Sequence, residues 1–269
     1  MSIRNGTLQL GDDTMHYIRF GSGKKTLIVL PGLGDGLTTV KGTALPMALM
    51  YRIFARDYTV FMFSRRNHLP QGHTTRDMAR DLKAAMDGLG IEKADLMGVS
   101  MGGMIAQHFA ADYPERLGKL VLVVTCSRPN PILTESVQEW IDLARRGDHT
   151  AFMGSNLRRM YSDGYYRKNR WLVPVMGRLT KPKSYERLYI QAHACLTHDA
   201  SERLAEITAP TLVIGGEQDR TLGAEPSREI AAAIPDAQLK MYAEWGHGLY
   251  EEARDFNRIV LDFLNGDCA

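Results

Sequence analysis

Short apolar runs alternate with amphipathic segments along the first half of the chain. The runs at 58–64, 94–98 and 119–124, and KTLIVL at 25–30, are too short for helices. Such runs, closed by turn residues such as the Pro-Gly after KTLIVL, indicate buried strands. Before them, GTLQLGDDTMHYIRFG (6–21) predicts two strands joined at a tight turn. The chain therefore begins as an edge hairpin followed by buried strands.

Two segments between these strands have the features of helices. Within 74–89 the apolar positions recur at helical spacing, with Thr74 at the start and Gly90 just after the end. The Ala-rich stretch at 101–112 is a second helix. Strand and helix in regular alternation require crossover connections. They therefore predict a mostly parallel sheet with helices on both faces.

This alternation stops after Val124. Residues 127–206 contain helical stretches such as ESVQEWIDLARRG and YERLYIQAHACL, without a convincing strand pattern. The later elements are a strand within 209–219, a helix near 225–234, a strand at 237–242 and a closing amphipathic helix at 251–264. We predict an α/β core formed by 1–126 and 207–269, with 127–206 inserted as a helical cap.

Composition and charge exclude several classes of protein. The 269 residues carry a net charge of +2, which argues against a surface that binds nucleic acid. MSIRNGTLQLGDD lacks the apolar stretch of a signal peptide, and no later segment has the apolar length of a membrane-spanning helix. Cys126, Cys195 and Cys268 are few and scattered, so no disulfide framework is expected. The sequence predicts a cytoplasmic protein.

GVSMG (98–102) lies between the strand at 94–98 and the helix at 101–112. In this setting the pattern G-x-S-x-G is typical of a sharp strand-to-helix turn that exposes a nucleophilic serine. Gly98 and Gly102 allow the backbone to bend without side-chain clashes. The free N–H groups of the helix N-terminus can stabilise a developing oxyanion. We predict Ser100 as the nucleophile; the alternative is a tight turn that happens to contain a serine.

A serine hydroxyl needs a base to take its proton and a carboxylate to orient that base. Asp219 directly follows the strand TLVIGG, and His247 follows the next strand, between two glycines. Each alone is compatible with an ordinary loop residue. Together they follow Ser100 in the order Ser, Asp, His, at the carboxyl ends of successive strands. This arrangement predicts a catalytic triad of Ser100, Asp219 and His247.

With these motifs, the chain resembles the α/β-hydrolase fold family along almost its whole length. VLPGLGDG (29–36) is similar to the loop that supplies half of the family's oxyanion hole. By this resemblance the oxyanion would be held by the backbone N–H groups of Leu33 and Met101. Many relatives have His-Gly where this chain has Pro31-Gly32, and SRRNHLPQGHTT departs from the usual form of its loop.

Residue identities separate this chain from some branches of that family. Haloalkane dehalogenases and epoxide hydrolases use an aspartate nucleophile, and proline iminopeptidases have a longer Gly-Gly-Pro-Gly loop. The serine core resembles small esterases, enol-lactonases and cofactor-free perhydrolases. The resemblance implies hydrolysis of a carboxylic ester or lactone of a small molecule, without metal or organic cofactor. Two alternatives stay open: acyl transfer or perhydrolysis with the same triad, and a ligand receptor with little turnover.

Other polar residues receive a structural interpretation. His193, Cys195 and His198 are close in sequence, but a zinc site needs a fourth ligand, and His193 and Cys195 would face different sides of a helix. Asp35 and Glu217 are expected to be turn or solvated residues. His68 and His73 are expected near the pocket mouth, although an ordinary polar loop explains them equally well. Core packing is expected for most of a group of methionines, with the lining of an adaptable pocket as the alternative: Met47, Met50, Met101, Met104, Met153, Met160 and Met176.

The predicted cap is mildly basic. Residues 127–206 carry thirteen Lys or Arg against nine Asp or Glu, whereas the remainder carries twenty against twenty-two. We expect most of these charges, including 145–146 and 165–170, on solvated helix faces. The alternative is that some of them, with Tyr165 or Tyr166, face the pocket and attract an acidic substrate. We expect no nucleic-acid or membrane partner, and a monomer or small homo-oligomer.

Overall fold

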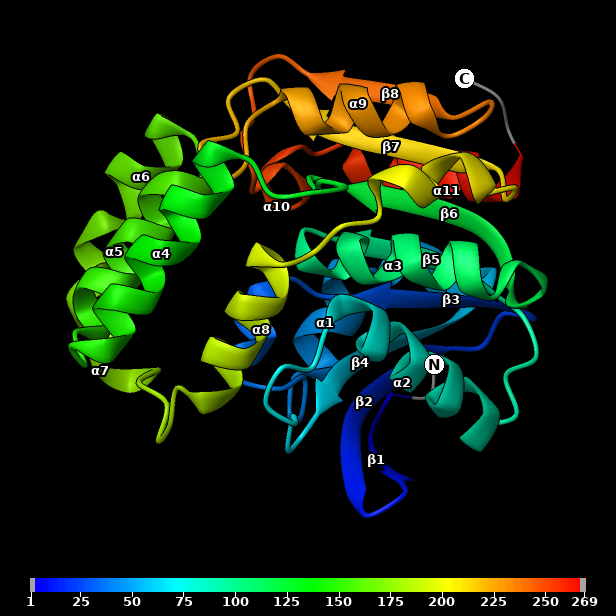
Figure 1. Ribbon diagram of the computed structural model, residues 1–269, viewed down its shortest axis with the longest axis horizontal. Helices are drawn as coiled ribbons and strands as arrows, with labels where there is room; N and C mark the ends of the chain where they lie inside the picture. The colour runs from blue at the N-terminus through cyan, green and yellow to red at the C-terminus, as the bar shows by residue number, and fades with distance from the viewer. Residues whose placement is uncertain (1–2, 267–269) are drawn as a thin grey trace.

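The computed structural model describes residues 3–266 of the chain, so Cys268 lies outside the described residues. Eight strands form one sheet in the order β1-β2-β4-β3-β5-β6-β7-β8 (Figure 1). The sheet contains β1 (Arg4–Leu10), β2 (Asp13–Gly21), β3 (Lys25–Leu30), β4 (Tyr58–Arg66), β5 (Ala94–Val99), β6 (Leu117–Val123), β7 (Thr211–Gly216) and β8 (Gln238–Tyr242). The pairs from β4 to β8 are parallel, and β2 is antiparallel to both its neighbours.

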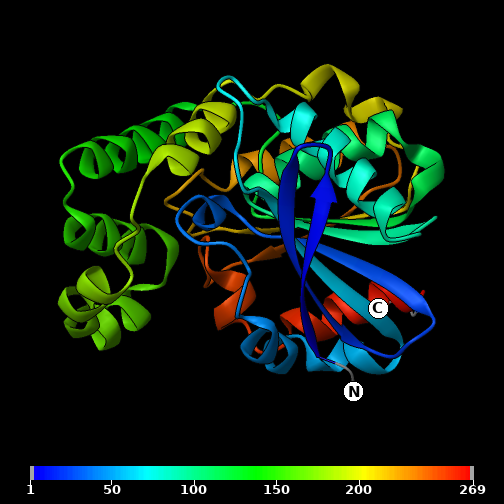
Figure 2. The same ribbon diagram turned by 90° about the horizontal axis from the view of Figure 1, so that it is seen from below.

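Helices cover both faces of the sheet, as the view in Figure 2 shows. On one face lie α2 (Thr75–Gly88), α3 (Met101–Asp112) and α9 (Glu225–Ala233); on the other lie α1 (Ala44–Met50) and α11 (Phe256–Asn265). Successive strand residues contribute to opposite faces: Ile28 and Leu30 pack with α2 and α3, whereas Leu27 and Val29 pack with α1 and α11. The central strands are therefore apolar throughout because both of their faces are buried.

A group of helices lies beyond one end of the sheet (Figure 1). It consists of α4 (Pro131–Arg145), α5 (His149–Met160), α6 (Asp163–Asn169), α7 (Val173–Leu179) and α8 (Glu186–Leu196). Helix α8 lies nearest to the sheet and contacts the loop after β3, whereas α7 contacts α5. As expected from the sequence, 127–206 is helical without a strand. Its division from the core as a separate cap stays a prediction.

Two elements differ from the sequence prediction. The closing segment contains two helices, α10 (Leu249–Glu252) and α11, instead of one. Ala253 is buried with an extended conformation (φ −78°, ψ 114°), so the chain turns between them. Helix α1 was not predicted, because its sequence ALPMALM is apolar at almost every position and has no alternation of helical period. Leu45 and Leu49 on this helix are exposed.

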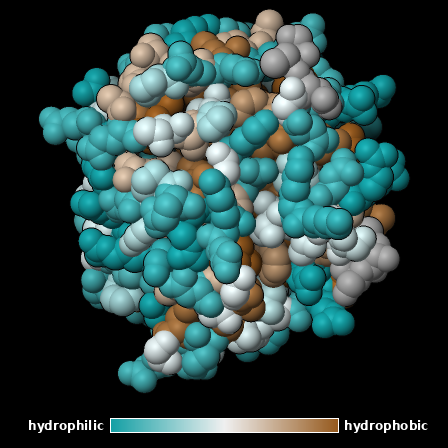
Figure 3. Space-filling model, turned by 90° about the vertical axis from the view of Figure 1, so that its right-hand side faces the viewer, coloured by the Kyte–Doolittle hydropathy of each residue, from teal (hydrophilic) through white to brown (hydrophobic). Residues whose placement is uncertain are grey.

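The end of the molecule opposite to α4–α7 has a mainly hydrophilic surface with scattered apolar side chains (Figure 3). Within 3–266, no helix combines the length and apolar character needed to cross a membrane.

Cys126 and Cys195 are both buried free thiols. Burial raises the pKa of the Cys195 thiol to about 12, which keeps it protonated and unreactive at neutral pH.

Candidate active site

Ser100 lies at the sharp turn between β5 and α3. Its backbone has φ 54° and ψ −120°, a strained conformation for a residue with a side chain. The turn is tight: a Cβ on Gly102 would lie 2.1 Å from the carbonyl oxygen of Leu30, and one on Gly98 would lie 2.5 Å from that of Gly102. The Ser100 N–H donates to the Val123 carbonyl at 2.8 Å, which anchors the turn to β6. The two glycines are required because the backbones approach so closely.

The structure brings Ser100, His247 and Asp219 together, although they are distant in sequence. His247 Nε2 lies 3.0 Å from Ser100 Oγ, and His247 Nδ1 lies 2.7 Å from Asp219 Oδ2. The other carboxylate oxygen of Asp219 accepts from the N–H groups of Thr221 at 2.7 Å and Leu222 at 3.0 Å. A carboxylate can only accept, so Nδ1 of a neutral His247 carries the proton. Nε2 is then free to accept the hydroxyl proton of Ser100.

The backbone N–H groups proposed to bind an oxyanion are at the starts of two helical segments. Leu33 begins a short 3-10 helix, Leu33–Gly36, and Met101 is the first residue of α3. Neither N–H donates a hydrogen bond to any residue in the described part of the chain. Gly32 packs directly on Ser100, since a Cβ there would lie 3.3 Å from the Ser100 Cβ. Both donors are thus adjacent to Ser100 and available to an additional acceptor.

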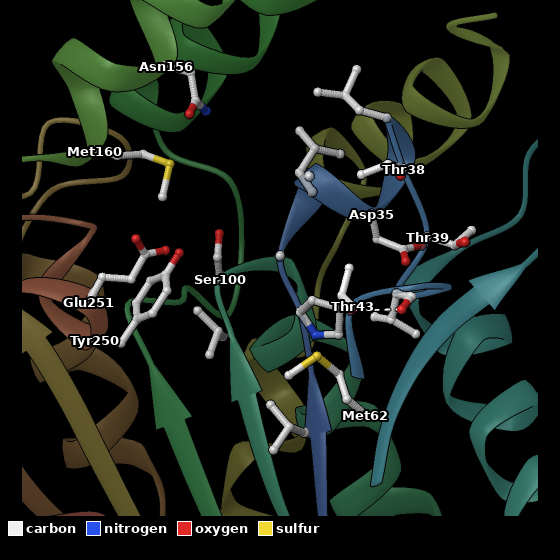
Figure 4. Close-up of a pocket in the computed structure, with 18 of the residues that line it drawn as sticks. Asp35, Thr38, Thr39, Thr43, Met62, Ser100, Asn156, Met160, Tyr250 and Glu251 are labelled. Atoms are coloured by element: carbon white, nitrogen blue, oxygen red, sulfur yellow. Dashed lines mark hydrogen bonds between the residues drawn. The ribbon is translucent and has the colours of Figure 1, made fainter. Parts of the chain in front are cut away.

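A cavity of about 490 Å³ lies above Ser100 and His247, between the strand ends and helices α4 and α5. Its volume is within the usual range for small-molecule sites. Figure 4 shows side chains entering it from several elements, with Asn156 and Met160 on the side opposite Ser100. Its apolar and aromatic lining includes Val40, Met47, Met62, Val99, Trp140, Phe152, Met153 and Tyr250. The polar side chains that line it are Asp35, Thr38, Thr39, Thr43, Tyr51, Asn156 and Glu251, with Ser100 and His247.

The seven methionines divide between the core and the cavity wall. Met101 and Met104 are buried in the core, while Met47 and Met153 pack against the core and also line the cavity. Met50 and Met160 line the cavity, and Met176 is exposed. Methionine has a flexible, unbranched side chain, which lets it fill an irregular cavity wall as readily as a core gap. Residue type alone therefore could not separate the two environments.

Asp35 lies in the short 3-10 helix after β3, as expected of a turn residue, but it is buried, with 4% of its surface exposed. Its Oδ2 accepts from Arg187 Nη2 at 2.8 Å and from the Arg65 N–H at 3.1 Å. Arg187 also donates to the Asp35 carbonyl at 2.8 Å. Because Arg187 belongs to α8, the ion pair ties this helix to the loop that contains Leu33. No local pattern in the chain indicates this ion pair, since 152 positions separate the two residues. Glu217, by contrast, is half-exposed and pairs with Arg228, as expected of a loop residue.

His68 and His73 do not line the cavity, and their contacts agree with the alternative of an ordinary polar loop. His68 is exposed and its Nδ1 lies 3.0 Å from Asp13, while His73 Nε2 lies 2.8 Å from Asp81. Both side chains are therefore held by carboxylates of the core. The loop that carries them turns toward α2 and β2, a direction that its polar sequence did not encode.

His193 and Cys195 lie on different sides of α8, as expected from helical geometry. His193 is exposed, whereas Cys195 and His198 are buried. His198 packs edge-on against His108 at 5.0 Å, and its Nδ1 lies 2.9 Å from the Thr75 hydroxyl. Burial lowers the pKa of His198 to about 3 and that of His108 to about 4, so both rings are neutral at pH 7.

The basic residues of 165–170 lie away from the cavity, on the exposed surface of α6 and its continuation. Tyr165 stacks on Tyr161 with ring centroids 4.3 Å apart, and Arg158 lies over the ring of Tyr166. Neither Tyr165 nor Tyr166 lines the cavity. The expectation of solvated basic helix faces is confirmed, and the alternative of a basic pocket wall was wrong.

Known proteins of similar sequence and structure agree with this architecture. Residues 25–253 match the alpha/beta hydrolase fold family. The chain is 30% identical to a 2-hydroxy-6-oxo-6-phenylhexa-2,4-dienoate hydrolase of Comamonas testosteroni, over 95% of this chain and 92% of that protein. It is 33% identical to a 2-hydroxy-6-oxononadienedioate/2-hydroxy-6-oxononatrienedioate hydrolase of Paraburkholderia phymatum, over 93% and 90% of the two chains.

A solved structure, the enol-lactonase from Burkholderia xenovorans LB400, superposes with a TM-score of 0.81. The alignment covers 97% of this chain and 100% of that one, at 22% identity, which establishes a common fold. The match to the family agrees with the strand order of the sheet and with its antiparallel second strand. The chain belongs to the α/β-hydrolase fold family.

Proposed function

We propose that this protein is a serine hydrolase that cleaves carboxylic esters or lactones of small molecules through an acyl-enzyme. The observation that carries the proposal is the continuous line of hydrogen bonds from Asp219 through His247 to Ser100. This line ends at a largely apolar cavity of small-molecule size. These groups have the relative positions that activation of a serine hydroxyl requires.

In the first step, Ser100 Oγ attacks the carbonyl carbon of the substrate while His247 Nε2 takes the hydroxyl proton. Asp219 holds the ring and stabilises the resulting imidazolium. The carbonyl oxygen becomes negatively charged and accepts hydrogen bonds from the N–H groups of Leu33 and Met101. When this intermediate collapses, His247 protonates the leaving alcohol or enol oxygen. The acyl group stays on Ser100.

In the second step, water attacks the acyl-enzyme. His247 takes a proton from this water and returns it to Ser100 Oγ as the acid departs, so the enzyme regains its starting state. The apolar cavity wall removes bulk water from the carbonyl, which strengthens the hydrogen bonds to the oxyanion. We interpret 127–206 as a cap, whose helices α4 and α5 cover the cavity and so limit it to small substrates.

A second candidate is hydrolysis of a carbon–carbon bond, which the curated relatives favour. Their names describe hydroxy-oxo-dienoates, compounds with no ester or lactone bond, so hydrolysis must break a bond beside the ketone. Those compounds carry carboxylates. In the described part of the chain, no Lys or Arg lines the cavity to receive a carboxylate, and Arg187 is bound to Asp35. We therefore place ester or lactone hydrolysis first.

The test combines labelling with turnover. We expect a fluorophosphonate probe to label the wild-type protein on Ser100, identified by peptide mass spectrometry. We also expect turnover of members of an ester and lactone panel with graded acyl lengths. Ser100→Ala should abolish both, with a loss of several orders of magnitude in kcat/KM. Ser127→Ala is a matched control, because Ser127 is buried after β6 and does not line the cavity.

The same panel distinguishes the alternatives. A 2-hydroxy-6-oxo-dienoate turned over faster than every ester would place carbon–carbon hydrolysis first. Products formed with added alcohol or hydrogen peroxide in preference to water would indicate acyl transfer. A single burst on Ser100 without steady turnover of any compound would indicate a receptor. Labelling that maps to another serine would contradict the proposal itself.

A further inference from the structure

One acidic side chain of the cavity is not explained by the reaction above. Glu251 lies on the short helix α10, which directly follows the loop of His247, and it lines the same cavity as Ser100. In Figure 4 its side chain reaches into the space beside Tyr250 and below Met160. Its carboxylate accepts one hydrogen bond, from the Tyr161 hydroxyl at 2.7 Å. The carboxylate is thus held in place without being neutralised.

The other acidic groups nearby are occupied by partners. Asp35, the second carboxylate of the cavity, forms an ion pair with Arg187. Glu252, next to Glu251 in the chain, accepts from the N–H and the hydroxyl of Ser162 at 2.9 and 2.6 Å. Glu251 has no Lys, Arg or His within ion-pair distance in the described residues, 3–266. Burial raises the pKa of Glu251, and the neighbouring Glu252 adds to this effect.

The cavity therefore contains a carboxyl group without a cationic partner, and within residues 3–266 no Lys or Arg lines it. A carboxylate without a cationic partner attracts a cation and repels an anion. Tyr250, Trp140 and Phe152 add aromatic surface to the same cavity. Aromatic rings attract ammonium groups, and the attraction increases when water is excluded. Both features favour the same kind of ligand.

We propose that Glu251 forms a subsite for a positively charged group of the substrate, so that the preferred substrates are esters or lactones bearing an amino or alkylammonium group. This inference rests on the proposed ester hydrolysis and adds the substrate class to it. It also distinguishes this chain from the relatives named above, whose substrates are named as carboxylates. In a productive complex the ammonium group contacts Glu251 while the carbonyl carbon lies at Ser100.

The experiment compares esters that differ only in charge. For the alcohol side, the pair is butyrylcholine and 3,3-dimethylbutyl butyrate, in which a carbon atom replaces the nitrogen. For the acyl side, the pair is the nitrophenyl esters of 4-(trimethylammonio)butyrate and 5,5-dimethylhexanoate. The nitrophenyl monoester of glutarate supplies the anionic case. We expect the cationic member of at least one pair to have about tenfold higher kcat/KM at low salt, the effect of one charge-assisted contact.

Two variants assign the preference to its residue. Glu251→Gln keeps the size of the side chain and removes the charge, so the cation preference should fall to near unity while turnover of the neutral ester persists. Glu252→Gln makes the same change at the neighbouring position, whose carboxylate is bound to Ser162, and should keep the preference. Turnover of the neutral esters reports folding of each variant independently of the charged subsite.

The outcomes separate the subsite from the reaction. Neutral esters turned over by Ser100 without a cation preference, or with a preference for the glutarate ester, would overturn the subsite and leave ester hydrolysis intact. A cation preference that survives in Glu251→Gln would overturn its assignment to Glu251. If the wild type turns over no ester and Ser100 is not labelled, the proposed function and the subsite both fall.

Discussion

The floor and the roof of the cavity are built in different ways. The floor consists of Gly32, Leu33, Ser100 and His247, at the carboxyl ends of strands and in the loops that follow them. The roof consists of the side chains of Trp140, Phe152, Met153, Asn156 and Met160 on α4 and α5. In the floor, backbone atoms are in contact and leave no room for a Cβ at Gly102. In the roof, flexible side chains form the surface.

This difference separates chemistry from selectivity. The positions in the floor depend on the sheet, whose parallel strands fix where each loop begins. The roof meets the His247 loop through the backbone, where the Gly248 N–H donates to the Met160 carbonyl, so we expect side-chain changes in the roof to leave Ser100 and His247 in place. Changes in the floor should therefore affect the rate of reaction with every substrate, whereas changes in the roof should affect which substrate is preferred.

The largest effect should come from the floor. Asp219→Asn leaves a side chain of the same shape but no negative charge for the His247 ring, and the amide can favour the wrong tautomer. We expect kcat to fall by about three to four orders of magnitude for every ester tested. Glu217→Gln, two positions earlier in the same loop, is the matched control and should retain turnover. Near-normal rates in Asp219→Asn would place the orienting carboxylate elsewhere.

An intermediate effect is expected where roof and floor meet. Arg187 on α8 holds Asp35 and thereby the loop whose Leu33 N–H faces the oxyanion in our mechanism. Arg187→Gln should lower kcat about ten- to a hundredfold with a smaller change in KM, because only the transition state uses that donor. It should also lower the free energy of unfolding, since it leaves the Asp35 charge buried without a partner.

Two further variants separate these consequences for Arg187. Arg178→Gln removes an exposed arginine of α7 and should alter neither kcat nor unfolding. The double variant Asp35→Asn with Arg187→Gln should recover part of the stability, because it leaves no unpaired charge, but not the full kcat. If Arg187→Gln raises KM and leaves kcat unchanged, Arg187 acts in substrate binding and not on the loop.

The smallest effect should come from the roof. Met160→Ala shortens a side chain that enters the cavity opposite Ser100 (Figure 4). We expect kcat/KM for short acyl chains to fall about two- to tenfold, while esters with longer chains lose less or gain, since the space above the carbonyl increases. Met176→Ala, on the exposed face of α7, should leave the chain-length profile unchanged. A uniform loss for all chain lengths would show that the roof also supports the floor.

Much of the floor was predictable because its signals are local. GVSMG contains both glycines that the tight turn requires, next to the serine that the turn exposes. Asp219 and His247 each follow a strand that is recognisable from its own residues. Parallel strands with crossover connections bring their carboxyl ends to one edge. The proximity of the three residues could thus be predicted, and the hydrogen-bond distances agree with it.

The roof was not predictable at the same level. The amphipathic pattern of 127–206 predicts helices, but not which of their residues face Ser100. Met153 and Met160 line the cavity while Met176 points outward, although all three occur in similar helical sequence. The orientation depends on how α4, α5 and α8 pack against one another and against the strand ends. That packing involves residues far apart in the chain, which periodicity does not record.

By itself, then, the sequence determined the alternation of strands and helices and the family, and it predicted the proximity of Ser100, Asp219 and His247, because each of these features is specified by immediate neighbours in the chain. Only the tertiary structure decided the charge of the cavity. Asp35 is neutralised by Arg187 from a distant helix, whereas Glu251 is left without a cation. Charge compensation depends on distances of a few ångströms between separate elements, and a sequence fixes such distances only through the complete fold.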